Sequence, residues 1–314
     1  MKEQYNITEE RNPKTKDIDK VSSVEMMTLL NEEDKLVADA VALEIVDIAK
    51  SVDVISDTLK KGGRLIYIGA GTSGRIGILD ASEVVSAYGI EEGKIIAFIA
   101  GGKEALTKSV GGAQDDKAMG IEELKGINFT ANDVIIGISS SGATPYVTGA
   151  LEYAKRLGGP TIALTSTGES ECSQIADIII STIVGPEAIT GSTRLKSATA
   201  HKMVLNMIST GVMIRMGKVY ENLMVEVAPA NYKLIKRRNK VVCEACNVDP
   251  AKAEELLSQG NGSTKLAITM GLTELESDQA KVLLEYHGND VRAAVTDESF
   301  QQGIKKGNAK PIFE

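Results

Sequence analysis

The sequence predicts an α/β protein in which a five-stranded parallel sheet is flanked by helices on both faces. Five short apolar runs alternate with stretches whose apolar residues recur at helical spacing, and a turn rich in Gly, Ser, Thr or Pro follows each run. Continuous apolar runs are typical of parallel strands buried on both faces, and their alternation with helices is typical of a doubly wound sheet. We place the strands at 64–69, 94–100, 133–138, 160–165 and 177–182.

Helices are expected before and after this sheet. Val24 to Lys60 carries apolar residues at helical spacing, which predicts helices that cover one face of the sheet. Arg194 to Gly217 predicts one long helix. Five of its apolar residues are expected to be buried: Val204, Met207, Ile208, Val212 and Ile214.

The carboxyl-terminal part, about 240–300, contains short helix-like segments separated by turns at Asn247–Pro250, Gly260–Gly262 and His287–Asn289. This pattern predicts a small three-helix unit. Three parts are therefore expected: an amino-terminal arm with helices that pack on the sheet (1–60), a sheet domain (61–225) and a helical carboxyl-terminal region (226–314).

Composition and charge indicate a cytoplasmic enzyme. The 314 residues are 43% hydrophobic, no apolar run is long enough to span a membrane, and the first twenty residues are too polar for a signal peptide. A formal net charge of −8 argues against nucleic-acid binding, so we interpret the basic run from Lys233 to Lys240 as a solvated helix face.

No metal site and no disulfide framework are expected from the three cysteines. Cys243 and Cys246 form a single C-x-x-C pair without a second pair or a histidine cluster, and their spacing fits two neighbours on one helix face. His201 and His287 also lack companion ligands, so both are expected to be structural.

The most informative segment is the glycine-rich turn after the first strand. Gly69, Gly71 and Gly74 permit a tight turn, and Thr72 and Ser73 stand where the next helix begins. Free backbone N–H groups and the positive end of the helix dipole favour an anion at such a place. Gly71, Thr72 and Ser73 are therefore predicted to bind a phosphate.

The same turn satisfies the dinucleotide pattern Gly-x-Gly-x-x-Gly. A nicotinamide site also needs an acidic residue at the end of the second strand, and this strand ends in Gly101-Gly102. We therefore favour a sugar phosphate over a dinucleotide, and the remaining alternative is a glycine turn that only packs.

A second hydroxyl-rich turn follows the third strand. Because parallel strands present such turns at one edge of the sheet, the two turns could converge on one phosphorylated sugar, although Ser and Thr also cap helices routinely. This turn contributes four candidate ligands: Ser139, Ser140, Ser141 and Thr144. A polar segment before the long helix contributes three more: Glu187, Ser192 and Lys196.

Longer motifs resemble the N-acetylmuramic acid 6-phosphate etherases, a family of the sugar isomerase (SIS) domain superfamily. They cover nearly the whole chain in order, and they are TEERN, DIDKVSSVEM, GAGTSGRIGILDASE, SSSGATPY, VGPEAITGSTRLKSATAHK and KVYENLMVEV. The resemblance implies an SIS-type sheet. Separately, the stretch from Leu283 to Val295 is similar to the last helices of ubiquitin-associated-type folds.

The resemblance implies a cofactor-free lyase of cell-wall recycling that converts N-acetylmuramic acid 6-phosphate to N-acetylglucosamine 6-phosphate and D-lactate. Loss of the C2 proton of the ring-opened sugar expels the ether oxygen from C3, and water then adds. This chemistry needs a general base and a general acid. Glu83 falls on the family's general-acid position, and apolar Leu79, Val84 and Val85 are expected to surround it and favour its protonated form. The family also implies a homodimer, whose amino-terminal arm reaches the partner's pocket.

The sequence departs from the family at the second carboxylate. Gln114 stands where the family carries its basic Glu, and an amide cannot remove a proton from carbon near neutral pH. In a helix, Asp115 and Asp116 would point about 100° and 200° away from Gln114, so neither replaces it easily. Ala143 also stands where the family commonly has Arg, and the residues at 84–86 stand where it commonly has Cys-Pro-Pro.

Three functions therefore remain open. The first is an etherase, either with an unusual base or altered at one position so that Gln114 impairs its activity; the two intact hydroxyl-rich turns and Glu83 favour it. The second is a sugar-phosphate binding or regulatory protein that lost the chemistry, favoured by Gln114 and Ala143. The third is an aldose–ketose isomerase on the same domain, which leaves the whole-chain resemblance unexplained.

Overall fold

The computed structural model describes residues 7–226 and 232–305, and the chain separates into two compact units. The first unit extends to Val212, except for the short segment Ser86–Ile90, and the second begins at Met213. The expected arm and sheet domain thus form a single unit. The helical unit begins at Met213, ahead of the boundary drawn at 226.

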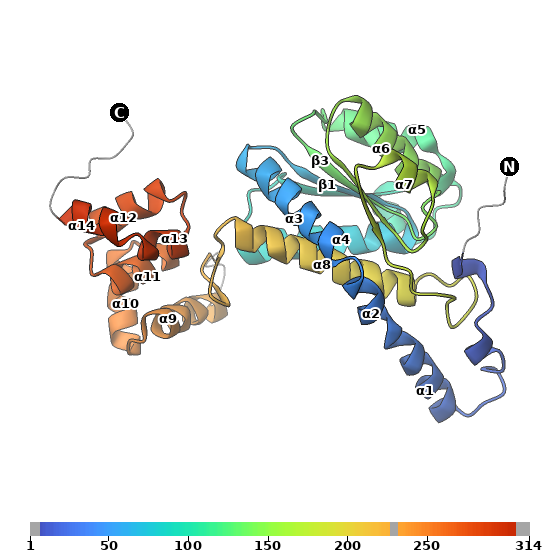
Figure 1. Cartoon of the computed structure of the whole chain (residues 1–314), viewed down its shortest axis with the longest axis horizontal. Helices are drawn as coiled ribbons and strands as arrows, with labels where there is room; N and C mark the ends of the chain where they lie inside the picture. Colours follow the sequence, from blue (N-terminus) through green and yellow to red (C-terminus); the bar gives the residue numbers. More distant parts are fainter. Residues whose placement is uncertain (1–6, 227–231, 306–314) are drawn as a thin grey trace. The chain divides into compact units, whose positions relative to one another are not determined.

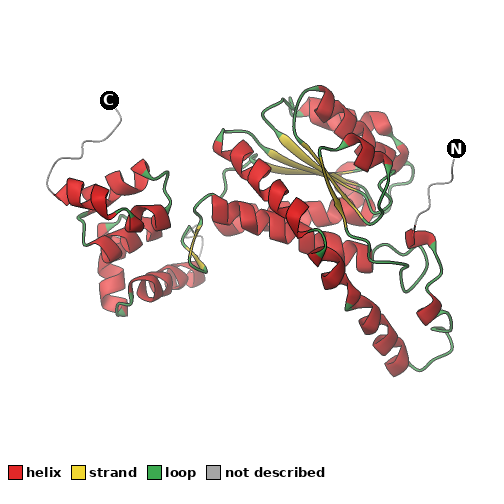
Figure 2. Cartoon of the chain, viewed as in Figure 1, coloured by secondary structure: helices red, strands yellow, loops and turns green. Residues whose placement is uncertain are grey.

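A five-stranded sheet forms the centre of the first unit (Figures 1 and 2). The strand order is β2-β1-β3-β4-β5, and every neighbouring pair is parallel. All five predicted strands are confirmed to within one residue at each end: β1 (Leu65–Gly69), β2 (Ile95–Ile99), β3 (Val134–Ile138), β4 (Thr161–Thr165) and β5 (Ile178–Ser181).

Helices cover both faces of this sheet, as expected for a doubly wound fold (Figure 1). One face carries α3 (Ile45–Lys60), α4 (Gly71–Tyr88) and α8 (Lys196–Arg215). The other carries α5 (Lys117–Gly126), α6 (Pro145–Arg156) and α7 (Glu171–Ile175). Gly77 lets α4 approach the sheet, because a Cβ there would lie 3.2 Å from both the Ile138 Cδ1 and the Tyr67 Cβ.

The amino-terminal helices include a segment that leaves the sheet. The helices α1 (Ser23–Asp34) and α2 (Leu36–Ala42) precede α3, and α1 projects away from the sheet (Figure 1). Ser22 begins α1 with a capping box in which its side chain and that of Glu25 satisfy each other's backbone N–H groups. The described residues of this unit also form four short 3₁₀ helices: η1 (Ile7–Glu9), η2 (Pro13–Thr15), η3 (Gly102–Leu106) and η4 (Ala113–Asp115).

The long helix α8 is confirmed, but two of its five expected core residues are exposed. Val204, Ile208 and Val212 are buried, whereas Met207 and Ile214 are 37% and 52% exposed. The prediction is wrong for these two residues because a helix against a sheet buries one stripe, and apolar residues beside that stripe face outward.

A buried polar cluster joins α4 to β1 and α8. The Asp80 carboxylate accepts hydrogen bonds from the Tyr67 hydroxyl at 2.9 Å, the Asn206 amide at 2.6 Å and the Ser209 hydroxyl at 3.0 Å. Burial raises the pKa of Asp80, and the three donors oppose that rise. The cluster fixes the rotation of α4 about its axis, and α4 begins at the glycine-rich turn.

His201 is a core residue, as predicted. It is fully buried on α8, and its Nε2 lies 3.1 Å from the Ser166 Oγ. Burial lowers the pKa of His201 to about 4. The second histidine, His287, ends a helix of the second unit and lies 3.3 Å from Asp297.

The second unit contains a two-stranded ribbon and six helices within its described residues. The ribbon pairs β6 (Val219–Tyr220) with β7 (Leu223–Met224). The helices are α9 (Tyr232–Cys246), α10 (Pro250–Gln259), α11 (Thr264–Thr273), α12 (Ser277–Tyr286), α13 (Val291–Thr296) and α14 (Glu298–Lys305).

The three predicted turns do not account for every helix break in this unit, so the expected three-helix unit is incomplete. Glu274 ends α11 with a φ of +55°, a left-handed conformation that glycine usually adopts. Because no glycine stands there, little in the local sequence indicates that α11 and α12 are separate helices.

Two cysteines of the second unit have free thiols. Cys243 and Cys246 lie on α9, and burial raises the pKa of Cys246 to about 11. Among the residues described, no group of His, Cys, Asp and Glu could hold a metal ion. Within the same residues, no helix is both long and apolar enough to cross a membrane.

Candidate active site

A cavity of about 240 Å³ lies where the two hydroxyl-rich turns meet at the carboxyl edge of the sheet. Eight predicted site residues line it: Gly71, Thr72, Ser73, Gln114, Ser139, Ser140, Ser141 and Thr144. The expected convergence of the turns after β1 and β3 is confirmed, because these strands are neighbours in the sheet.

Close packing of backbone shapes the first turn. A Cβ on Gly69 would lie 2.7 Å from the Gly74 nitrogen, so a side chain at this position would force the turn open. Gly71 has a φ of +53°, which glycine adopts without strain. The helix α4 begins at Gly71, so the N–H groups of its first turn have no partner within the helix and lie at the cavity.

The second turn holds its hydroxyls against one another. The Ser139 Oγ lies 2.7 Å from the Thr144 Oγ1 and accepts a hydrogen bond from the Gly142 nitrogen at 3.1 Å. The Ser139 nitrogen donates to the Leu164 carbonyl at 3.0 Å, which fixes the turn to β4. The Thr144 side chain makes no capping bond to α6, so helix capping does not explain its hydroxyl.

Two helix amino termini and neutral donors set the electrostatics of this cavity. The helices α4 and α6 both begin at it, and each contributes the positive end of its dipole. Among the described residues that line the cavity there is no Lys or Arg, and Glu9 is the one carboxylate. Such a site favours an anion and holds it with N–H and O–H groups, which suits a phosphate monoester.

Gln114, at the family's base position, also lines this cavity. It belongs to the 3₁₀ turn η4, which Gly112 introduces with a φ of +75°. Asp116 begins α5 and accepts a hydrogen bond from the Met119 nitrogen at 3.0 Å, and neither it nor Asp115 lines the cavity. The segment is a 3₁₀ turn rather than an α-helix, but neither aspartate takes the place of Gln114.

Glu83 lies elsewhere on α4. Ten residues separate it from Ser73, which is about 15 Å along a helix, and it does not line the cavity. Its side chain is exposed, Leu79 is 43% exposed, and Val84 is buried. The expectation that apolar neighbours enclose Glu83 is therefore wrong for the single chain, and its role as the general acid stays a prediction.

The third polar segment contributes a different residue from those predicted. Glu187 is fully buried and accepts hydrogen bonds from the Lys196 and Ser197 nitrogens, both at 3.0 Å, so it caps α8. The Lys196 Nζ, also buried, lies 2.6 Å from the Glu33 carboxylate. Buried charges need such partners.

Glu187, Lys196 and Ser192 do not line the cavity, whereas Thr193 does. Burial raises the pKa of Glu33, but hydrogen bonds from Lys196 and Asn12 outweigh it and lower the pKa overall. Substrate binding by Glu187, Ser192 and Lys196 stays a prediction.

The sequence analysis missed Thr8 and Glu9, which also line the cavity. The Thr8 carbonyl accepts a hydrogen bond from the Gly191 nitrogen at 3.1 Å, and the Thr15 hydroxyl donates to the Ala188 carbonyl at 2.7 Å. The amino-terminal arm therefore lies against the cavity of its own chain, and its reach to a partner's pocket stays a prediction. Both residues belong to the motif TEERN, which supported the family resemblance. The motif lies about 60 residues before the first turn, so nothing in the sequence indicated that it would fold against the cavity.

Family comparisons agree with this architecture. Residues 47–155 match the N-terminal SIS domain of glucokinase regulatory protein, and residues 121–211 match the SIS domain. Among solved structures, the chain is similar to a protein thought to be a phosphosugar isomerase involved in capsule formation in Bacteroides fragilis. The TM-score is 0.50 at 22% identity, over 64% of this chain and 95% of that one, which supports the fold.

Curated relatives extend the likeness to nearly the whole chain. The N-acetylmuramic acid 6-phosphate etherase of Erwinia tasmaniensis is 51% identical over 300 residues, which are 96% of this chain and 98% of that protein. The protein of the same name from Yersinia pestis is 50% identical over 289 residues, 92% of this chain and 98% of that one. The chain therefore belongs to the N-acetylmuramic acid 6-phosphate etherase family.

Proposed function

We propose that this chain is a carbon–oxygen lyase that cleaves the D-lactyl ether of N-acetylmuramic acid 6-phosphate. The observation that carries the proposal is the cavity between the two hydroxyl-rich turns, found in a chain that is about half identical to proteins named for this reaction. The products are N-acetylglucosamine 6-phosphate and D-lactate, with one water consumed.

The phosphate binds at the start of α4 and α6. The N–H groups of Thr72 and Ser73 and the hydroxyls of Ser139 to Ser141 surround its oxygens, and the two helix dipoles offset its charge. Holding the phosphate fixes the position of the sugar carbons relative to the rest of the cavity, where the proton of C2 is removed.

This chain lacks the carboxylate that serves as the proton acceptor in the family's usual arrangement. Gln114 lines the cavity but carries an amide, which hydrogen-bonds the substrate without accepting its C2 proton. Glu9 is the carboxylate of the same lining. We propose that Glu9 accepts the proton in this chain, and that elimination then expels the C3 oxygen with a proton from a general acid, a role predicted for Glu83.

A binding or regulatory protein without chemistry is the second candidate function. The amide of Gln114 in the cavity favours it, and so does the match of residues 47–155 to a domain of a regulatory protein. Both functions need the same phosphate site, so binding alone does not separate them.

D-lactate release separates the two functions. The natural chain and Gln114→Glu are each incubated with N-acetylmuramic acid 6-phosphate, and D-lactate is measured enzymatically. We expect slow release by the natural chain and an increase of about 10²–10⁴ in Gln114→Glu, the range of a well-placed general base. No release by either chain, with binding intact, would favour the regulatory function. Full activity with Gln114 would contradict the expectation that the missing carboxylate at position 114 slows the reaction.

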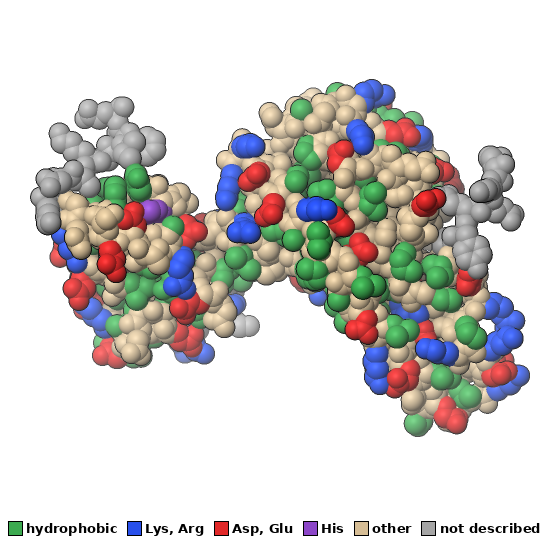
Figure 3. All heavy atoms as spheres, in the orientation of Figure 1, with side chains coloured by type: hydrophobic (Ala, Val, Ile, Leu, Met, Phe, Trp, Pro, Cys, Tyr) green, Lys and Arg blue, Asp and Glu red, His purple; other side chains and the backbone are tan. Residues whose placement is uncertain are grey.

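We also propose that the chain works in the cytoplasm as a homodimer. Large apolar side chains are exposed on α1 and around the start of α3, in the region of the projecting helices (Figures 1 and 3). Val24 is 77% exposed, Leu43 83% and Val46 65%. A second copy that covers this surface would remove it from water.

A further inference from the structure

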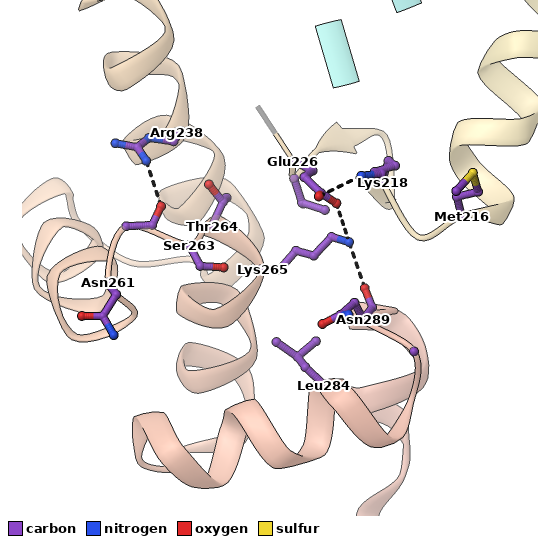
Figure 4. A pocket seen from close by; sticks show the side chains of 13 residues that line it. Met216, Lys218, Glu226, Arg238, Asn261, Ser263, Thr264, Lys265, Leu284 and Asn289 are labelled. Atoms are coloured by element: carbon purple, nitrogen blue, oxygen red, sulfur yellow. Dashed lines mark hydrogen bonds and ion pairs between the residues drawn. The ribbon is translucent and has the colours of Figure 1, made fainter. Parts of the chain in front are cut away.

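The second unit has its own cavity, of about 660 Å³, between the β6–β7 ribbon and the helices α9, α11 and α12 (Figure 4). It shares no residue with the cavity at the phosphate turns. Three basic side chains and one acidic side chain line it: Lys218, Arg238, Lys265 and Glu226. Polar groups at the start of α11 complete one wall, namely Ser263 and Thr264.

Two lysines with largely buried side chains form ion pairs with one carboxylate, that of Glu226, in this cavity. The Lys218 Nζ lies 2.8 Å from one oxygen of Glu226, and the Lys265 Nζ lies 2.7 Å from the other (Figure 4). The side chains of Lys218 and Lys265 are 13% and 10% exposed, whereas that of Glu226 is 41% exposed. The lysines are thus fixed in the wall, and the carboxylate that joins them is open to solvent.

Arg238 adds a third cation. Its Nη1 donates to the Gly262 carbonyl at 2.8 Å, while its Nε is buried and has no hydrogen-bond partner among the residues described. The interpretation of the basic run as a solvated helix face is therefore wrong for Arg238, and the side chain of Lys233 lies outside the described residues.

The charges of this lining do not balance. Burial raises the pKa of Glu226, but hydrogen bonds from Lys218 and Lys265 outweigh it and lower the pKa, so Glu226 is ionised near neutral pH. One carboxylate then faces three cations, in a chain whose formal net charge is −8. Positive charge that is fixed, concentrated and only partly neutralised favours a further anion.

The start of α11 lies in the same cavity. Ser263 caps the helix by accepting a hydrogen bond from the Leu266 nitrogen at 3.2 Å, and Thr264 and Lys265 form its first turn. The positive end of the dipole of this ten-residue helix therefore adds to the field of the lysines. Lys265 also donates to the Asn289 carbonyl at 3.0 Å, which holds its ammonium in place.

We propose that this cavity is a second anion site that binds a phosphate monoester, whose phosphate displaces the Glu226 carboxylate from Lys218 and Lys265. Glu226 has the geometry of an internal ligand, since its two oxygens occupy the positions that two phosphate oxygens would take. A dianion gains more from two ammonium groups than a single carboxylate does. The volume leaves room for the sugar that carries the phosphate.

Calorimetry on the full chain tests this proposal with two probes, inorganic phosphate and N-acetylglucosamine 6-phosphate. We expect two sites per chain for the sugar phosphate, of which one is lost in the double variant Lys218→Met, Lys265→Met and retained in the control Lys281→Met, an exposed lysine of the same unit. If the second site binds inorganic phosphate as tightly as the sugar phosphate, it recognises only the phosphate group. If it binds the sugar phosphate more tightly, it recognises the sugar as well.

Glu226→Gln distinguishes an anion site from a structural cross-link. If the Glu226 carboxylate occupies the two lysines about nine-tenths of the time, loss of its charge lowers the Kd for the ligand at this site about tenfold. A cross-link without binding predicts no second site in any variant and a lower melting temperature in Glu226→Gln. That outcome would overturn the proposal, as would a second site that survives loss of both lysines.

A crystal of the natural chain soaked in tungstate, an anion that substitutes for phosphate, tests the site without any variant that could fail to fold. An anomalous peak between Lys218 and Lys265, with Glu226 moved aside, is the expected result. Glu226 still bound to both lysines in a crystal whose first cavity holds tungstate would overturn the proposal and leave the phosphate turns unaffected.

Discussion

Ser73 and Ser139 are neutral hydroxyl side chains at the centre of the proposed anion site. Each stands just after a buried strand, beside the start of a helix, and both line the same cavity. Their places at one edge of the sheet could be predicted from the sequence, because each follows an apolar run that ends in a turn rich in hydroxyls and glycine. Glu9 carried no comparable signal, since only the folded arm brings residue 9 to a turn that begins at residue 69.

Loss of the Ser73 site should abolish phosphate binding. In Ser73→Leu, a hydroxyl at the mouth of α4 is replaced by a bulky apolar group, so we expect the Kd for N-acetylglucosamine 6-phosphate at this cavity to rise about 10²-fold or more. Calorimetry measures it, with Ser82→Leu, on the exposed side of the same helix, as the control. Unchanged affinity in Ser73→Leu would remove the first turn from the phosphate site.

Glu9→Gln tests the proposed proton acceptor. The amide keeps the size of the side chain but cannot accept the C2 proton, so D-lactate release by the natural chain should fall about 10²–10⁴-fold while sugar-phosphate binding persists. The neighbouring Glu10→Gln is the matched control. Equal rates in both variants would show that Glu9 is not the base.

The strands were the most predictable elements, and the helix faces the least. The strands β1, β3 and β4 are buried on both faces, which admits few polar residues, so their apolar runs had clear ends. The edge strands β2 and β5 are partly exposed but equally apolar. Helix faces depend on what packs against them, which is why Met207 and Ile214 of α8 were misjudged. The break between α11 and α12 depends on a left-handed Glu274, which no local pattern indicates.

The helix α8 carries a pH-dependent contribution to stability through His201. Its folded pKa of about 4 lies below the ordinary value of 6.5, so the unfolded chain binds the proton more readily. The contribution is complete above about pH 6.5 and is lost as the pH falls toward 4, by an amount on the order of 3 kcal/mol.

Urea unfolding at pH 7 and pH 5 measures this contribution. His201→Gln cannot take up the proton, so its free energy of unfolding should change less between these two pH values than that of the natural chain. Parallel losses in both proteins would mean that His201 is not responsible.

At the scale of the whole molecule, the sequence indicated an α/β chain with a helical carboxyl-terminal region, and the structure has both. The contacts that join the amino-terminal arm to the sheet unit could not be predicted, because they connect residues far apart in sequence, such as the ion pair of Glu33 with Lys196. The cavity of the second unit was missed for the same reason, since Lys218, Arg238 and Lys265 meet only in the folded unit.

The proposed homodimer makes a separate prediction at this scale. Leu43→Glu combined with Val46→Glu places two charges on the exposed apolar surface. We expect the dissociation constant of the dimer to rise at least about tenfold, since an unpaired charge is costly in an interface. Light scattering across a dilution series measures the mass. A natural chain that is monomeric throughout, or a variant that dimerises equally well, would contradict the proposed surface.

The most direct measurement is a crystal structure of the natural chain with N-acetylglucosamine 6-phosphate. We predict that the phosphate lies within hydrogen-bond distance of Ser73 and of the turn from Ser139 to Ser141, with the sugar carbons directed toward Gln114 and Glu9. A cavity without the sugar phosphate at saturating concentration, or a sugar directed away from both side chains, would contradict the central claim.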